Sequence, residues 1–334
     1  MNKKANDELE FTSWWNESDD IEKILKRNID DIFKNKDNFY DFGLQLKESI
    51  YDKDIFTDVF CNETSSNTIE VVYPNREKEN IRPIPIEYLP LAAGDKKVVG
   101  DCYLVSHRPT IGYPSGGKID RIDIFMDNEG EDADEVVKKV ATKFKEYLTD
   151  AGTLDQLNIW EEKCPPLAGG DLDCSSSAKQ LKPYEVYWHR KIPDREIVSY
   201  PNSLLIFIGH YGEGKFQFNK ERTSYFTGSL GRMISPNYLL NVCGKPASAA
   251  FDENISAEFR NLIYAYKEIS SDEAATSTFC AVDRYMAIPP ENCISMSRWM
   301  REVRTCMKER LQSDVPSDLA FHLVGNMEEK VCRN

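Results

Sequence analysis

Short apolar runs alternate along this chain with longer segments whose apolar side chains recur at helical spacing. Residues 203–208, SLLIFI, are almost wholly apolar and lead into the glycine-rich turn GHYGEG. A strand buried on both faces has this pattern. The segment at residues 131–152 instead carries an amphipathic stripe that ends near Gly152, which is typical of a helix. Strands that alternate with helices predict a parallel sheet that is covered on both faces.

The other segments extend this pattern to a fold class. We expect strands at residues 69–74, 97–109, 121–126, 238–243 and 275–283. Helical spacing of apolar residues predicts further helices at Ile255–Ile269 and Ile294–Leu311. The predicted fold is therefore α/β, a three-layer α/β/α sandwich with a mainly parallel sheet.

The N-terminal part has a different composition. Residues 1–65 are rich in Asp, Glu, Lys and Asn, and Ile21, Leu25, Ile29 and Ile32 recur at helical spacing. The polar stretch CNETSSNT, which starts at residue 61, is a plausible boundary. We predict an acidic helical N-terminal region over residues 1–65 and one larger domain over residues 66–334.

Charge and hydropathy exclude several classes of function. The formal net charge of -14 argues against a nucleic-acid partner, because binding to phosphates requires concentrated Lys and Arg. The sequence has no apolar run of about 18 residues, so no membrane-spanning helix is expected. The N-terminus lacks the apolar core of a secretory signal, so we expect a cytoplasmic protein.

Neither the cysteines nor the histidines have the spacing of a metal site. The nine cysteines are scattered, which favours reduced thiols over a disulfide framework, and no pair has C-x-x-C spacing. Only four histidines are present, and His107, His189 and His322 have no motif around them. We therefore expect no structural metal.

The glycine-rich turn permits two interpretations. Residues 209–215 read G-x-x-x-x-G-K, which is most of a phosphate-binding loop. Phe216 follows where that loop needs a metal-binding hydroxyl, and the sequence after it has no helical stripe to form the helix that cradles phosphate. The nucleotide-binding interpretation is therefore the weaker one.

The alternative interpretation concerns His210 together with Cys243. His210 comes just after the apolar run SLLIFI, and Cys243 ends the run YLLNVC. Each of the two residues is followed by a glycine within two positions. Functional side chains gather at the carboxyl ends of parallel strands, so the two would share a crevice. An imidazole beside a thiol favours the nucleophilic thiolate. A structural histidine and a buried structural thiol remain the alternatives.

These segments resemble the CHAT family, bacterial relatives of caspases and separases. LLIFIGHYGEG and YLLNVCGKPASA match its strand ending in His-Gly and its later strand ending in Cys, and ATSTFCAVDRYMA is similar to the segment after that cysteine. IPIEYLPL resembles the family's Pro-x-Glu-Leu-Leu segment at Pro85, Glu87 and Leu89, with Tyr88 as a departure. The resemblance covers roughly residues 80–315. The insertion of Tyr211 between His210 and glycine is a second departure.

The resemblance implies a cysteine endopeptidase with a caspase-like peptidase domain. Cys243 would attack the peptide carbonyl, His210 would transfer protons, and the backbone N–H groups of Gly212 and Cys243 would hold the oxyanion. No cofactor is expected. The implied partners are a protein or peptide substrate and an activating protein, and the implied setting is bacterial defence or cell death. The rival is a non-catalytic caspase-like interaction module.

Acidic residues could line the substrate pocket. Asp283 follows the apolar run TFCAV of the predicted strand at residues 275–283, so it could lie at the same rim and favour a basic substrate residue. A surface aspartate is the alternative. Asp123, inside a predicted strand, is a second candidate because a buried carboxylate needs a partner. The acidic stretch Asp127–Glu135 fits a solvated helix start better than a calcium site.

Overall fold

We describe a computed structural model of the chain. It describes residues 24, 29–49, 68–73, 85–91, 97–109, 117–128, 131, 133–160, 186–190, 198–199, 202–212, 215–217, 223–227, 229–230, 233–234, 237–244, 260–313 and 316–333. The first residues of the predicted N-terminal helix and the proposed boundary at residues 61–67 lie outside this part of the chain.

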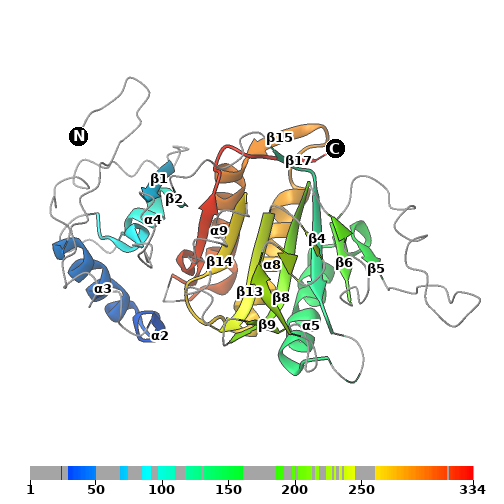
Figure 1. Ribbon diagram of the computed structural model, residues 1–334, viewed down its shortest axis with the longest axis horizontal. Helices are drawn as coiled ribbons and strands as arrows, with labels where there is room; N and C mark the ends of the chain where they lie inside the picture. Colours follow the sequence, from blue (N-terminus) through cyan, green and yellow to red (C-terminus); the bar gives the residue numbers. More distant parts are fainter. Residues whose placement is uncertain are drawn as a thin grey trace, which may run out of the picture.

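Within the described residues, nine strands form one large, mostly parallel sheet that is flanked by helices (Figure 1). Its order is β1 (Thr68–Tyr73), β2 (Leu104–Pro109), β16 (Phe321–Gly325), β14 (Asn261–Ala265), β13 (Asn237–Gly244), β8 (Ser203–Gly212), β4 (Arg121–Met126), β6 (Val186–His189) and β5 (Asn158–Trp160). Only the β14–β16 pair is antiparallel among these neighbours. The predicted α/β class and mainly parallel sheet are confirmed.

Shorter strands extend the main sheet and form a second one. The end of β8 turns back into β9 (Lys215–Gln217), which continues through β10 (Thr223–Thr227), β11 (Ser229–Leu230) and β12 (Met233–Ile234) to β7 (Val198–Ser199). A separate small sheet contains β15 (Asn292–Ser295), β17 (Lys330–Arg333) and β3 (Lys118–Ile119). Figure 1 shows β9 at the lower edge of the main sheet and β15 and β17 at its upper edge.

Three long helices pack on one face of the sheet. They are α5 (Glu135–Asp150), α8 (Ser271–Met286) and α9 (Met296–Leu311), and Figure 1 shows α8 and α9 behind the central strands. Ile206 and Ile208 of β8 belong to one buried cluster with Phe144 of α5, Phe279 of α8 and Trp299 of α9. This cluster is the larger part of the core.

The other face carries a second apolar cluster, which extends from Ile69 of β1 across the sheet to Phe125 of β4. It receives Phe39 and Phe42 of α3 (Lys36–Ser49), Tyr88 of η2 (Ile86–Tyr88), and Tyr238 of β13. The remaining short elements are α2 (Ile29–Ile32), α4 (Val99–Cys102), η3 (Leu154–Gln156) and η5 (Ser317–Ala320). The predicted helical character of the N-terminal region is confirmed for α2 and α3.

The helices α5 and α9 match their predictions. Asp134 caps α5 by accepting hydrogen bonds from the N–H groups of Val136 and Val137, as an acidic helix start favours. Beyond the other end of α5, Gly152 has a φ of 67°, a left-handed conformation that glycine adopts without strain.

Two predictions for the residues between β13 and α9 are wrong, because a helix stands where we expect a strand and a strand where we expect a helix. The predicted strand at residues 275–283 is part of α8, and the predicted helix at Ile255–Ile269 contains β14. Ten consecutive residues of α8, Glu273–Val282, are buried, so no polar face reveals the helical period. Ser270 and Glu273 form a capping box that starts α8, which is the signal in the sequence that favours a helix.

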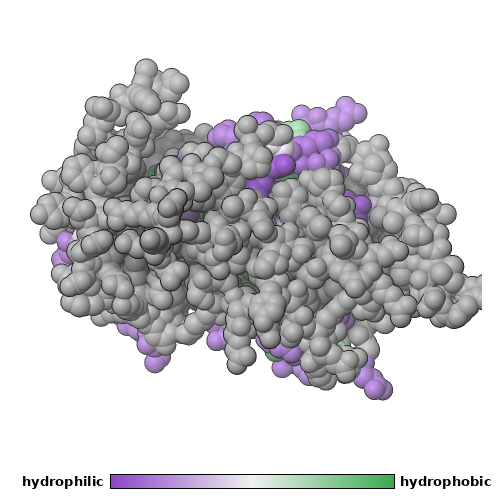
Figure 2. Space-filling view, in the orientation of Figure 1, coloured by the Kyte–Doolittle hydropathy of each residue, from purple (hydrophilic) through white to green (hydrophobic). Residues whose placement is uncertain are grey.

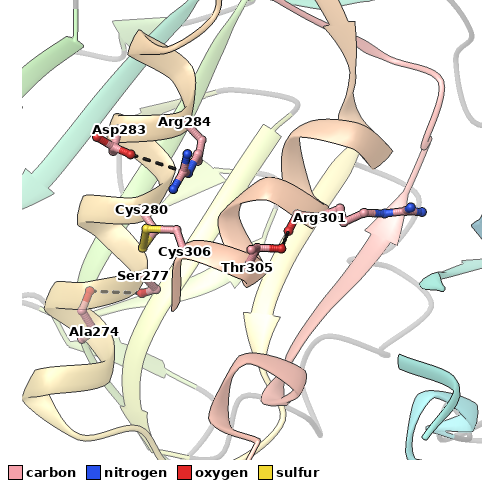
Figure 3. The surroundings of a disulfide bond; sticks show 8 residues. All are labelled: Ala274, Ser277, Cys280, Asp283, Arg284, Arg301, Thr305 and Cys306. Atoms are coloured by element: carbon pink, nitrogen blue, oxygen red, sulfur yellow. Dashed lines mark hydrogen bonds and ion pairs between the residues drawn. A yellow bond between two sulfur atoms is a disulfide. The ribbon is translucent and has the colours of Figure 1, made fainter. Parts of the chain in front are cut away.

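The expectation of reduced thiols is also wrong for five of the described cysteines, Cys102, Cys280, Cys293, Cys306 and Cys332. Cys280 of α8 is bonded to Cys306 of α9, as Figure 3 shows, and Cys293 of β15 is bonded to Cys332 of β17. Cys102 is disulfide-bonded as well. The first bond joins two helices that pack on the main sheet, and the second joins two strands of the small sheet.

The described surface is mainly polar. Leu44, which is 42% exposed, is the one large apolar side chain at the surface among the described residues, and the coloured atoms in Figure 2 are mostly hydrophilic. None of the described helices combines the length and the hydrophobicity that crossing a membrane requires.

Candidate functional site

The candidate site lies where β8 runs past its neighbour β4. Met126, the last residue of β4, pairs with Ile208, so residues 209–212 of β8 extend beyond β4. On its other side β8 stays paired with β13, and there His210 is the register partner of Cys243. The backbones of neighbouring strands lie about 4.8 Å apart. The topology therefore brings these two predicted residues together.

His210 lies on the face of the sheet that the long helices cover. Leu204, Ile206 and Ile208 of β8 contribute to the cluster with α5, α8 and α9. Side chains alternate along a strand, so His210 lies on this same face, at its open end. The His210 side chain is 28% exposed, which leaves it accessible to a substrate.

Asp134 holds the ring of His210. The Nε2 atom of His210 is 2.9 Å from Oδ1 of Asp134, the residue that caps α5. Burial alone raises the pKa of Asp134, but the hydrogen bond from His210 and those from the Val136 and Val137 N–H groups outweigh it and lower that pKa. The Asp134 carboxylate is therefore ionised near neutral pH.

This contact determines which ring nitrogen can act as a base. An ionised carboxylate only accepts hydrogen bonds, so Nε2 of His210 must carry the proton that it shares with Asp134. In the neutral imidazole, Nδ1 then has the free lone pair. An acid that orients a histidine in this way is the third member of a nucleophile–base–acid arrangement.

Gly209 is required by close packing of the β8–β9 hairpin. A Cβ atom added at Gly209 would lie 2.5 Å from the carbonyl oxygen of Gln217 and 2.8 Å from a ring carbon of Phe216. Phe216 is fully buried and packs its ring against Phe207, with centroids 5.9 Å apart. The glycine before His210 therefore serves the hairpin.

The same hairpin argues against the phosphate-loop interpretation. Lys215 begins β9, an antiparallel strand that pairs with the end of β8, and no helix starts there. The expectation that no phosphate-cradling helix follows this turn is confirmed.

A polar contact anchors β13 close to Cys243. The buried amide of Asn241 donates from Nδ2 to Oγ1 of Thr278 and accepts at Oδ1 from Ser277, both at 2.8 Å. Both partners lie in α8, and Asn241 is two residues before Cys243 along the strand. These bonds position the end of β13 against the helix layer.

The predicted oxyanion donors lie at the same edge. Gly212 is the last residue of β8 and pairs with Lys215 across the hairpin turn, while Cys243 pairs with His210. The backbone therefore brings both positions near the histidine. Their role as N–H donors to an oxyanion stays a prediction.

Asp123 lies away from His210, on the opposite face of the sheet. Ile122 and Ile124 of β4 face the long helices, so Asp123 between them faces the other side. Its fully buried carboxylate binds Arg121, His189 at 2.7 Å and Ser203 at 2.5 Å. The interpretation of Asp123 as a pocket residue is not supported, because its carboxylate is buried and bonded to these three side chains.

Asp283 lies at the opposite edge of the sheet from His210. Two residues further along α8, the hydroxyl of Tyr285 donates to the carbonyl of Asp120 at 2.7 Å, just before the amino end of β4. The carboxylate of Asp283 is 3.6 Å from the neighbouring Arg284, as Figure 3 shows. The prediction that Asp283 lies at the rim beside His210 depended on a strand that is in fact a helix, so Asp283 is better described as a surface aspartate.

The chain has no recognised relatives in two comparisons. No protein-family model matches it, and no curated protein is significantly similar to it. The resemblance to CHAT peptidases therefore stays a prediction from the motifs.

Sequence reasoning missed Asp134 as the partner of His210. One signal was present: Asp134 belongs to an acidic stretch between a predicted strand and its following helix. In a parallel sheet that stretch must cross the carboxyl edge where His210 lies. Sequence reasoning also missed that Glu87, His107 and His322 meet in the core.

Proposed function

We propose that this protein is a cysteine endopeptidase with a catalytic dyad of His210 and Cys243, oriented by Asp134. The observation that carries the proposal is the register pairing of His210 with Cys243 at the carboxyl edge of two adjacent parallel strands. The hydrogen bond from Nε2 of His210 to Asp134 supports it, because it leaves Nδ1 as the proton acceptor.

The proposed reaction has two stages. The Cys243 thiolate attacks the substrate carbonyl carbon, and protonated His210 gives its proton to the leaving amine as the C–N bond breaks. Water then attacks the thioester with His210 as base, which releases the acid and restores the thiol. The N–H groups of Gly212 and Cys243 are the proposed donors to the oxyanion in both stages.

Substrate and setting are proposed on the resemblance alone. The substrate would be a protein or peptide, an activating partner would control the site, and the setting would be bacterial defence or cell death. A cytoplasmic location stays a prediction, and the disulfides at Cys280–Cys306 and Cys293–Cys332 weigh against it. Such bonds persist mainly in oxidising compartments.

The proposal is tested with the full chain and a library of labelled peptides. We expect wild type to cleave a subset of peptides, and Cys243→Ala and His210→Gln to lose this cleavage. A thiol-alkylating peptide probe should modify Cys243 in wild type, as mapped by mass spectrometry, and should do so far more slowly in His210→Gln.

His189→Gln is the matched control. It removes another imidazole that is paired with an aspartate, a buried one on the opposite face of the sheet. It should retain cleavage. Equal cleavage by wild type and Cys243→Ala would overturn the proposal, as would the absence of both cleavage and selective alkylation. The second result would favour the interaction-module alternative.

A further inference from the structure

Three potential metal ligands meet inside the fold, far apart in the sequence. Glu87 belongs to η2, His107 to β2 and His322 to β16, and each side chain is at most 1% exposed. One ligand atom from each of them lies within 4.8 Å of the others. The pairing of β2 with β16 brings the two histidines together, and their rings stack with centroids 5.6 Å apart.

Two buried polar atoms in this cluster have no hydrogen-bond partner. Nδ1 of His322 lies 3.1 Å from Oε1 of Glu87, yet it makes no hydrogen bond in the described structure. Oε2 of Glu87 also lacks a hydrogen-bond partner there. Leaving a buried polar atom unsatisfied is costly, so each such atom requires an explanation. Both atoms belong to the cluster, which points to a ligand between them.

The other nitrogen of His322 shows which lone pair is available. Its Nε2 is 2.7 Å from the hydroxyl of Tyr88, and that hydroxyl donates to the carbonyl of Leu319 at 3.3 Å. A hydroxyl has one proton, so Tyr88 can accept from Nε2–H while it donates to Leu319. Nδ1 then carries a lone pair that is directed at Glu87. Histidines that bind metals are commonly held in this way through their other nitrogen.

The spacing of the atoms fits a tetrahedral ion. Zinc binds imidazole nitrogen and carboxylate oxygen at about 2.0–2.2 Å, so two ligand atoms of a tetrahedral site lie about 3.3 Å apart. The contact between Glu87 and Nδ1 of His322 is 3.1 Å, and Nε2 of His107 is 3.4 Å from each carboxylate oxygen of Glu87. Each imidazole nitrogen therefore lies at a distance from the Glu87 carboxylate that one shared Zn²⁺ ion requires.

We propose that Glu87, His107 and His322 bind one Zn²⁺ ion, through the carboxylate, Nε2 of His107 and Nδ1 of His322. The second carboxylate oxygen of Glu87 can complete the coordination. Two imidazoles and one carboxylate also suit iron in open sites, but these three side chains are closed to solvent. The closed position therefore gives the ion a structural role, as a link from η2 to two strands of the sheet.

The sequence predicts no metal because the ligands have no recognisable spacing. His107 and His322 are separated by most of the chain, so only the strand order brings them together.

A positive charge near the site lowers the affinity that we expect for Zn²⁺. Arg304 interacts electrostatically with both Glu87 and His322, and its positive charge opposes a cation there. We therefore expect weaker binding than in a zinc finger.

The test is a zinc titration of the metal-stripped full chain against a chromophoric chelator. We expect one equivalent of Zn²⁺ to bind wild type and to raise its melting temperature. Glu87→Gln, His107→Gln and His322→Gln should each weaken binding more than tenfold and lose the thermal shift. Tyr88→Phe should weaken it about tenfold, because it removes the partner that orients His322.

Cobalt identifies the ligands directly. Co²⁺-loaded wild type should show the visible absorption of a tetrahedral site without the charge-transfer band of a thiolate. His189→Gln and Cys243→Ala are controls outside the cluster and should keep one equivalent. Zinc binding in Cys243→Ala also separates this proposal from the peptidase proposal.

Three results would overturn the zinc site. They are the absence of stoichiometric binding to folded wild type, binding that survives His322→Gln with unchanged affinity, and a cobalt spectrum with thiolate ligands. If His322→Gln does not fold, the stoichiometry and the cobalt spectrum of wild type still decide.

Discussion

His210 and Cys243 stand opposite each other in the parallel ladder between β8 and β13, and Asp134 contacts the ring of His210. The chain separates these residues widely, but three parallel strands deliver them to one edge of the sheet. A different local contact positions each of the three strand ends at this edge. Gly209 permits the hairpin after β8, Asn241 ties β13 to α8, and the start of α5 holds Asp134.

The first prediction concerns Asp134→Asn. Asparagine caps helices about as well as aspartate, so the free energy of unfolding should change by less than about 1 kcal/mol. The charge that holds Nε2–H of His210 is lost, and we expect kcat for peptide cleavage to fall on the order of 10²–10⁴-fold with little change in KM. Steady-state kinetics and the pH profile of kcat/KM measure this.

Glu135→Gln is the control for Asp134→Asn. Glu135 is the next residue along the chain, and its side chain is 71% exposed and paired with Lys138. Its kinetics should match wild type. Equal losses of kcat in both variants would show that general charge near the helix start, rather than the contact with His210, affects cleavage.

Most of the fold that positions the site could be predicted from sequence. The apolar runs that form β8 and β13 and the stripes of α5 and α9 are strong local patterns. The exchange of α8 and β14 shows where such reasoning fails, because a helix buried almost all round has no polar face. The contacts of Asp134, His107 and His322 depend on strand order and register, which no short motif encodes.

A second prediction concerns Gly209→Ala. The added Cβ would meet the backbone oxygen of Gln217, which can move away only if the hairpin shifts. We expect a loss of about 1–3 kcal/mol in the free energy of unfolding and a strong loss of cleavage, because His210 is the next residue. Denaturant titration and peptide kinetics measure the two effects.

Gly152→Ala is the control for Gly209→Ala, because it strains the backbone away from the site. Gly152 has a positive φ beyond the end of α5, and a Cβ there would meet nothing within 4 Å. This change should cost about 1 kcal/mol of stability and leave cleavage unchanged. Normal cleavage by Gly209→Ala would contradict the tight packing described for the hairpin.

The third prediction concerns pH and the carboxylate of Asp123. Burial raises its pKa, but the hydrogen bond and charge of His189 and the charge of Arg121 outweigh burial, so the pKa lies below its usual value. A lowered pKa stabilises the fold above the unfolded pKa of about 4, and this stability is lost as pH falls through the folded value. Asp123→Asn should cost about 3–5 kcal/mol at pH 7, because Arg121 and His189 lose a buried partner.

The pH dependence distinguishes this charge effect from a packing defect. The difference between wild type and Asp123→Asn should shrink as the pH falls below about 4, as followed by urea denaturation at several pH values. Asp283→Asn, at a partly exposed position, should change stability by less than about 1 kcal/mol. A difference that stays constant from pH 7 to pH 3 would show that Asp123 is not stabilising as a carboxylate.

The last prediction concerns the disulfide between Cys280 and Cys306. It joins α8 to α9 across a separation of 26 residues, in the layer that supports the site (Figure 3). The double variant Cys280→Ala and Cys306→Ala should lose about 2–4 kcal/mol in the free energy of unfolding. The same change in Cys293 and Cys332, which join two short strands at the amino edge, tests whether the second bond contributes equally. Peptide mapping without reductant should recover both cross-linked peptides from wild type, and free thiols at all four positions would refute the assignment.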